Sequence, residues 1–99
     1  MGVNKRTRAL QIPPRVKRIV YERDGGRCIL CGAPGDPVAH YISRAQGGLG
    51  VEENVVTLCC GCHRAYDQGP HRAAIRRVIA DYLQGFYPHW DESKLTYRK

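Results

Sequence analysis

The sequence predicts a small α+β domain in which two short strands and flanking helices are held together by a bound metal ion. Two Cys-x-x-Cys pairs, Cys28/Cys31 and Cys59/Cys62, have the spacing of zinc knuckles. Between the pairs, residues 38–43 and 54–58 favour strands on either side of a loop with three glycines. We expect these strands to pair antiparallel across that loop.

The expected helices lie before, within and after this region. Residues 14–24 predict the first, because Pro14 suits a first helical position and Asp24-Gly25-Gly26 ends it. A second should begin near Cys60 and end by Gly69-Pro70. A third is predicted over residues 71–84, with Phe86 just past its end. Its apolar stripe consists of Ile75, Val78, Ile79, Tyr82 and Leu83.

Length and charge limit the classes of protein that the chain can belong to. Its 99 residues suit one domain with a modest core, which a structural metal would help to stabilise. No apolar run approaches the ~20 residues of a membrane span, and no secretion signal is recognisable. We therefore expect a cytosolic protein without a membrane partner.

Positive charge is concentrated at the N-terminal end. The net charge is +7, and residues 1–18 contain six Lys or Arg residues and no acid. We interpret residues 1–12 as a basic flexible arm, which suits a polyanion such as nucleic acid. The alternative is a solvated tail that only aids solubility.

The cysteines predict a structural zinc ion. Five cysteines without a secretion signal argue against a disulfide framework. Two matched knuckles favour a tetrahedral site of four thiolates over four buried free thiols. Cys60 could replace Cys59 as a ligand, but Cys60-Gly61-Cys62 has the wrong spacing for a knuckle. We interpret Cys60 as an ordinary residue on the first helical turn.

Chemistry would have to come from His40, Asn54 and His63, since zinc held by four thiolates has no open position. His63 and Asp67 are four residues apart on a predicted helix and share one face. An imidazole and a carboxylate on one face can hold Mg²⁺ or Mn²⁺. Taken singly, a strand histidine is more often a core or surface residue, and an asparagine before a strand is usually a turn residue.

Together these residues resemble the HNH endonuclease family, in its zinc-ribbon branch. The pattern runs from Arg23 to Tyr66 and is similar to that of small HNH proteins of bacteriophages and prophages. The resemblance implies a ββα-metal, or His-Me finger, fold and a single nuclease domain over residues 13–99, with a four-cysteine zinc site and a C-terminal helix. It also implies the cytoplasm of a bacterial or phage-infected host cell. The residues that carry it are Cys28-x-x-Cys31, Ala39-His40, Gly47-Gly48, Asn54 and Leu58-Cys59-x-x-Cys62-His63.

The resemblance implies a role for each residue of the motif. His40 would be the general base, Asn54 would orient it, and His63 would bind the catalytic cation. The residue before the base is commonly Asp or His in the family, but here it is Ala39. We expect Asp67 to supply the missing ligand. Contacts with DNA phosphates are expected from Arg15, Lys17, Arg18, Arg44 and Arg64, although solvated surface charge is the competing interpretation.

The expected function is a metal-dependent DNA endonuclease that nicks or cuts duplex DNA. Zn²⁺ would be structural, and Mg²⁺ or Mn²⁺ catalytic. Two alternatives remain open. One is a zinc-ribbon DNA-binding module with an inactive nuclease centre, which Ala39 favours. The other is an adaptor for phage DNA-packaging proteins, which the basic arm disfavours. The sequence specifies neither the target site nor the oligomeric state.

Overall fold

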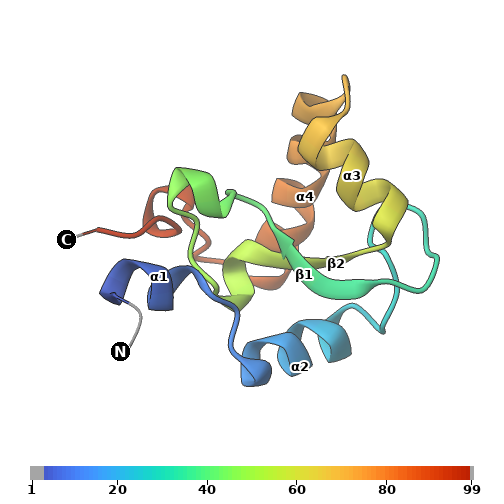
Figure 1. Ribbon diagram of the computed structural model, residues 1–99. Helices are drawn as coiled ribbons and strands as arrows, with labels where there is room; N and C mark the ends of the chain where they lie inside the picture. The colour runs from blue at the N-terminus through green and yellow to red at the C-terminus, as the bar shows by residue number, and fades with distance from the viewer. Residues whose placement is uncertain (1–3, 99) are drawn as a thin grey trace.

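The computed structural model describes residues 4–98 (Figure 1). Met1 to Val3, the first part of the expected arm, and Lys99 lie outside the described residues. Residues 4–98 have the predicted α+β fold, with a two-stranded sheet, helices on both sides and three short 3₁₀ helices. The elements are α1 (Lys5–Leu10), α2 (Pro14–Arg23), β1 (Asp36–His40), 3₁₀ helices at Arg44–Gln46 and Glu52–Asn54, β2 (Val55–Leu58), α3 (Cys60–Gln68), α4 (Arg72–Phe86) and a 3₁₀ helix at Glu92–Lys94.

The two strands pair antiparallel, as expected, but β1 is shifted towards the N-terminus. The register places Ala39 opposite Val56 and His40 opposite Val55, with an irregularity between Asp36 and Ala39. β1 was expected to continue to residue 43. It ends at His40 because the side chain of Asn54, rather than a β2 residue, binds the backbone of the segment that follows.

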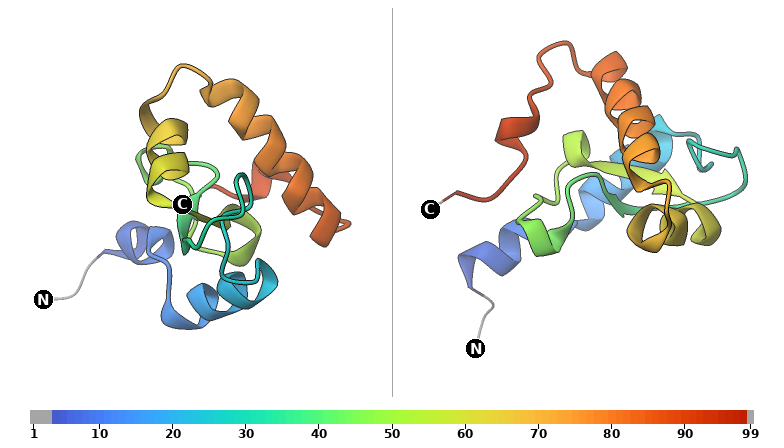
Figure 2. Two further views of the ribbon diagram at one scale, coloured as in Figure 1. Left: turned by 90° about the vertical axis from the view of Figure 1, so that its right-hand side faces the viewer. Right: turned by 90° about the horizontal axis from the view of Figure 1, so that it is seen from above.

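Helices cover the sheet on both faces (Figures 1 and 2). Val16 and Val20 of α2 pack with Val55 on one side. Val56 and Leu58 face the larger core on the other side, against α3 and α4. Successive strand residues point to opposite faces, so all four residues of β2 are buried. The larger core also contains Tyr41, Tyr66, Ile79, Leu83 and Leu95.

The helices follow the predicted apolar spacing, but their buried stripes are narrower than expected. In α4 only Ile79 and Leu83 are fully buried, and Val78 is 50% exposed. The helix also includes Phe86, which was expected beyond its end. A sheet of two strands offers a narrow surface, so each helix buries a narrow stripe. Within residues 4–98, no helix has the length and hydropathy of a membrane span.

Part of the expected flexible arm is helical. Asn4 caps α1 by accepting a hydrogen bond from the Thr7 N–H at 2.7 Å. Leu10, at the other end of α1, is only 3% exposed. One buried side chain and one cap thus give these residues an ordered position against the domain.

A buried ion pair joins the end of α2 to the rest of the domain. The Nε atom of Arg23 and the Oδ1 atom of Asp24 are 2.8 Å apart, and the two side chains are 6% and 0% exposed. Arg23 donates to the backbone carbonyls of Glu52 and Val55, each at 2.8 Å. The Tyr82 hydroxyl of α4 donates to Asp24 at 2.6 Å. The sequence indicated only a helix end here, so this network was not predicted.

The network makes stability depend on pH. Burial alone would raise the pKa of Asp24, but hydrogen bonds from Arg23 and Tyr82 outweigh burial and lower that pKa. A carboxyl group with a depressed folded-state pKa stabilises the fold above its unfolded pKa, and this contribution is lost as pH falls through the folded pKa. We expect Asp24→Asn to reduce the free energy of unfolding at neutral pH by about 3–5 kcal/mol, because it leaves the Arg23 charge buried without its partner.

Chemical denaturation from about pH 7 to about pH 3 tests this prediction. The difference between wild type and Asp24→Asn should be constant near neutrality and should shrink below about pH 4. Asp81→Asn, which changes an exposed carboxylate of α4, is the matched control and should stay close to wild type throughout. A difference for Asp24→Asn that does not change with pH contradicts the assignment.

Candidate functional site

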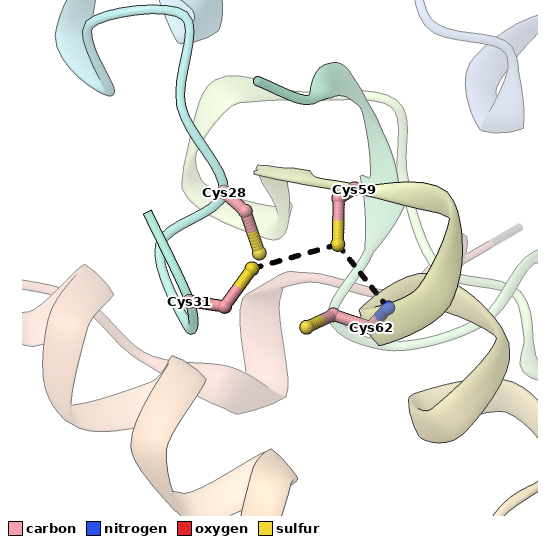
Figure 3. Close-up of side chains that lie close together, drawn as sticks. All are labelled: Cys28, Cys31, Cys59 and Cys62. Atoms are coloured by element: carbon pink, nitrogen blue, oxygen red, sulfur yellow. Dashed lines mark hydrogen bonds between the residues drawn. The ribbon is translucent and has the colours of Figure 1, made fainter. Parts of the chain in front are cut away.

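The four cysteines of the two knuckles form one cluster (Figure 3). Their sulfur atoms all lie within 4.8 Å of one another, and those of Cys31 and Cys59 are 3.6 Å apart. Cys59 also caps α3, its sulfur accepting from the Cys62 N–H at 3.4 Å. Gly32, with a φ of 81°, turns the chain after the first pair.

The protein backbone around the cluster favours a thiolate at Cys28. Burial raises the pKa of Cys28, but hydrogen bonds from the backbone at Cys59, Cys31 and Leu30 bring that pKa down to about 6. Burial and the neighbouring sulfur atoms raise the pKa of Cys62. Four thiolates this close require a cation to balance their charge, and the cluster could hold a zinc ion. Cys60 is exposed and lies outside the cluster.

A second group of polar side chains surrounds a hollow of about 250 Å³ beside β1 and α3. His40 reaches it from the end of β1, and His63 and Asp67 reach it from α3. The Nε2 atom of His63 is 3.5 Å from the Oδ2 atom of Asp67. Arg44, in the 3₁₀ helix after β1, also lines the hollow. The structure thus brings together four residues that the sequence singled out.

His40 is held in one orientation by the N-terminal segment. Its Nε2 atom is 3.0 Å from the backbone carbonyl oxygen of Leu10. A carbonyl only accepts, so Nε2 carries the proton and Nδ1 of the neutral ring has a free lone pair. Burial lowers the pKa of His40, the charge of Arg44 lowers it further, and the Leu10 carbonyl opposes them. The lowered pKa favours the neutral imidazole, which can accept a proton.

Asn54 fixes the turn that follows His40. Its side chain is fully buried and accepts from the Ile42 N–H at 2.8 Å. It also donates to the carbonyls of Ile42 and Leu49, at 3.2 and 2.8 Å. Asn54 lies away from the hollow and acts on the backbone around it.

Ala39 faces away from the hollow. It lies opposite Val56 in the strand register, is 1% exposed and belongs to the larger core. His40, opposite Val55, lies on the other face of β1. In this register, residue 39 does not supply a ligand to the group formed by His63 and Asp67.

The basic residues fall into three sets. Lys17 lines a second hollow of about 370 Å³ that adjoins the first, and His40 and Arg44 are part of both. Arg64 lines a separate hollow on α3 and is not brought to His40. Arg15 and Arg18 are exposed on α2 and line none of these hollows.

Comparison with known proteins agrees with this geometry. Residues 28–69 match the family model of the HNH endonucleases. The solved structure of the Type IV phosphorothioation-dependent restriction endonuclease ScoMcrA is similar, with a TM-score of 0.64 and 25% identity over 78% of this chain. The chain spans only 19% of the length of that enzyme. No curated protein matches it. The predicted resemblance to the HNH endonucleases is thus confirmed over residues 28–69.

The cluster leads to a prediction about metal content. We expect the purified protein to contain one zinc ion, and Cys28→Ser or Cys62→Ser to lose it together with the cooperative thermal transition, because metal binding is part of the folding free energy. Cys60→Ser is the matched control and should keep both. Elemental analysis and circular dichroism provide the measurements. Zinc that is retained in Cys59→Ser but lost in Cys60→Ser would show that the ligand assignment is wrong.

Proposed function

We propose that this domain is a metal-dependent endonuclease that hydrolyses phosphodiester bonds of duplex DNA, by nicking or cutting. One observation carries the proposal: a neutral histidine with a free Nδ1, a histidine–carboxylate pair and an arginine surround one hollow. The match of residues 28–69 to the HNH endonucleases supports it. The net charge of +7 suits a polyanionic substrate.

His63 and Asp67 are the residues proposed to hold the catalytic cation. Their nearest ligand atoms, 3.5 Å apart, are close enough to bind one ion together. Imidazole nitrogen and carboxylate oxygen suit Mn²⁺, and the carboxylate suits Mg²⁺. Such a cation usually keeps several positions for water and phosphate oxygens. When bound, it stabilises negative charge on the phosphate and on the leaving 3′ oxygen.

The remaining steps are assigned to the side chains themselves. His40 accepts a proton from the attacking water at Nδ1 while Nε2 donates to the Leu10 carbonyl. The guanidinium of Arg44 binds a phosphate oxygen in the same hollow. Lys17, in the adjoining hollow, binds the phosphate of a neighbouring nucleotide. The four thiolates of the cysteine cluster would hold a zinc ion at the start of α3, and this ion, with no open position, would take no part in the reaction.

The buried position of Ala39 supports one competing function. A centre without a ligand at this residue could bind DNA without cutting it. The two functions differ in whether His40 and Asp67 affect cleavage, and the next two predictions separate them.

We expect His40→Ala to slow cleavage of supercoiled plasmid by ~10²–10⁴, because it removes the general base. Zinc content and melting temperature should stay close to those of wild type, since the ring is only partly buried. His89→Ala, which changes an exposed histidine outside the hollow, is the control. Wild-type cleavage by His40→Ala would mean that another group is the base.

We expect Asp67→Ala to raise the Mg²⁺ concentration needed for half-maximal cleavage at least ~10-fold, because one of two protein ligands is lost. High Mn²⁺ should restore part of the rate, since Mn²⁺ binds the remaining imidazole more readily. Asp81→Ala controls for the loss of an exposed helical carboxylate. If Asp67→Ala needs no more Mg²⁺ than wild type, Asp67 is not a ligand.

A further inference from the structure

We propose that residues 4–12 form a strap that positions His40, with the backbone carbonyl of Leu10 holding the imidazole in one tautomer and one orientation. Leu10 is thus a positioning residue that acts through His40. The expected effect of the strap on cleavage rests on the proposed function, in which His40 is the general base. The contact between the strap and the ring is tested independently of cleavage.

The strap docks on the loop between the strands through backbone atoms. The Gly50 N–H donates to the Ala9 carbonyl at 3.0 Å. A Cβ atom on Gly50 would lie 1.8 Å from the carbonyl oxygen of Gln11, so only glycine permits this approach. The side chain of Leu10 is 3% exposed and anchors the strap beside this contact. The contacts of Gly50 with Ala9 and Gln11, the residues before and after Leu10, therefore hold the Leu10 carbonyl in place.

This placement determines which nitrogen of His40 is free. A neutral imidazole can carry its proton on either nitrogen, and the partner of one nitrogen decides the tautomer. The Leu10 carbonyl, 3.0 Å from Nε2, selects the tautomer whose Nδ1 accepts a proton. A shift of the strap would release the ring, and a misplacement of about 1 Å can reduce a rate by ~10².

The strap lies outside residues 28–69, so the segment that matches the HNH endonucleases does not include it. It also carries two separable features. Its backbone contacts His40, whereas its charged side chains, Lys5, Arg6 and Arg8, are exposed. We therefore expect the backbone of the strap to affect the rate of cleavage and its charged side chains to affect the affinity for DNA.

The test is Gly50→Ala, whose added methyl group displaces the strap at Gln11. The control is Gly85→Ala in α4, where a Cβ atom would meet nothing within 4 Å. We expect kcat for plasmid cleavage to fall ~10–100-fold in Gly50→Ala, with little change in KM and no loss of zinc. A variant with Lys5, Arg6 and Arg8 changed to Gln should show the opposite split, with a higher KM and an unchanged kcat.

Long-range ¹H–¹⁵N spectra of the His40 ring, assigned with His40→Ala, test the contact without cleavage. Wild type and Gly85→Ala should show one tautomer with the proton on Nε2, and Gly50→Ala should show the averaged shifts of two exchanging tautomers. If Gly50→Ala does not fold, Leu10→Ala, which removes the buried anchor without a clash, replaces it in both measurements.

We call Gly50→Ala, or Leu10→Ala where it is used instead, the displaced-strap variant. Two results overturn the proposal: a wild-type ring with its proton on Nδ1, or a ring spectrum that does not change in the displaced-strap variant. Equal losses of kcat in the displaced-strap variant and in Gly85→Ala also contradict it. If wild type cuts no DNA under any condition, the proposed function fails, and the ring spectra alone then decide whether the strap fixes His40.

Discussion

The buried amide of Asn54 is the interaction on which the geometry of the site depends. It binds the backbone of Ile42, two residues after His40, and that of Leu49, one residue before Gly50. One side chain thus fixes both the turn that carries the histidine and the loop on which the N-terminal segment docks. Replacing it with an apolar residue would leave buried backbone groups unpaired, at about 1–3 kcal/mol each. The position of His40 and the stability of the fold therefore share one cause.

The strand register has a comparable influence on the chemistry. Because His40 lies opposite Val55 and Ala39 opposite Val56, neighbouring residues of β1 face different layers of the domain. Ala39 lies in the larger core, whereas His40 lies in the layer next to α2 and the N-terminal segment. A carboxylate at residue 39 would have to be buried among apolar side chains, which is costly without a partner. The fold thus explains why the proposed cation ligands lie on α3.

Local patterns account for what the sequence predicted well. Paired cysteines, helical apolar spacing and a glycine loop between β-branched residues each depend on neighbours in the chain, and they placed the knuckles, α2 to α4 and the antiparallel strands. The contact of His40 with Leu10 left no such signal, because any residue offers a carbonyl. The orientation of Ala39 depends on an irregularity within β1. The order of α1 depends on one buried leucine, the Asn4 cap and a backbone contact with Gly50. Neither follows from residue type alone.

The ion pair at the end of α2 also links parts of the sequence that lie far apart. Arg23 and Asp24 bind the hydroxyl groups of Tyr87 and Tyr82, which follow 64 and 58 residues later. Contacts between such distant parts of a chain form slowly, because a long loop must close before the contacts can stabilise it. We therefore expect this network to form late in folding, after local elements such as α2 and α4.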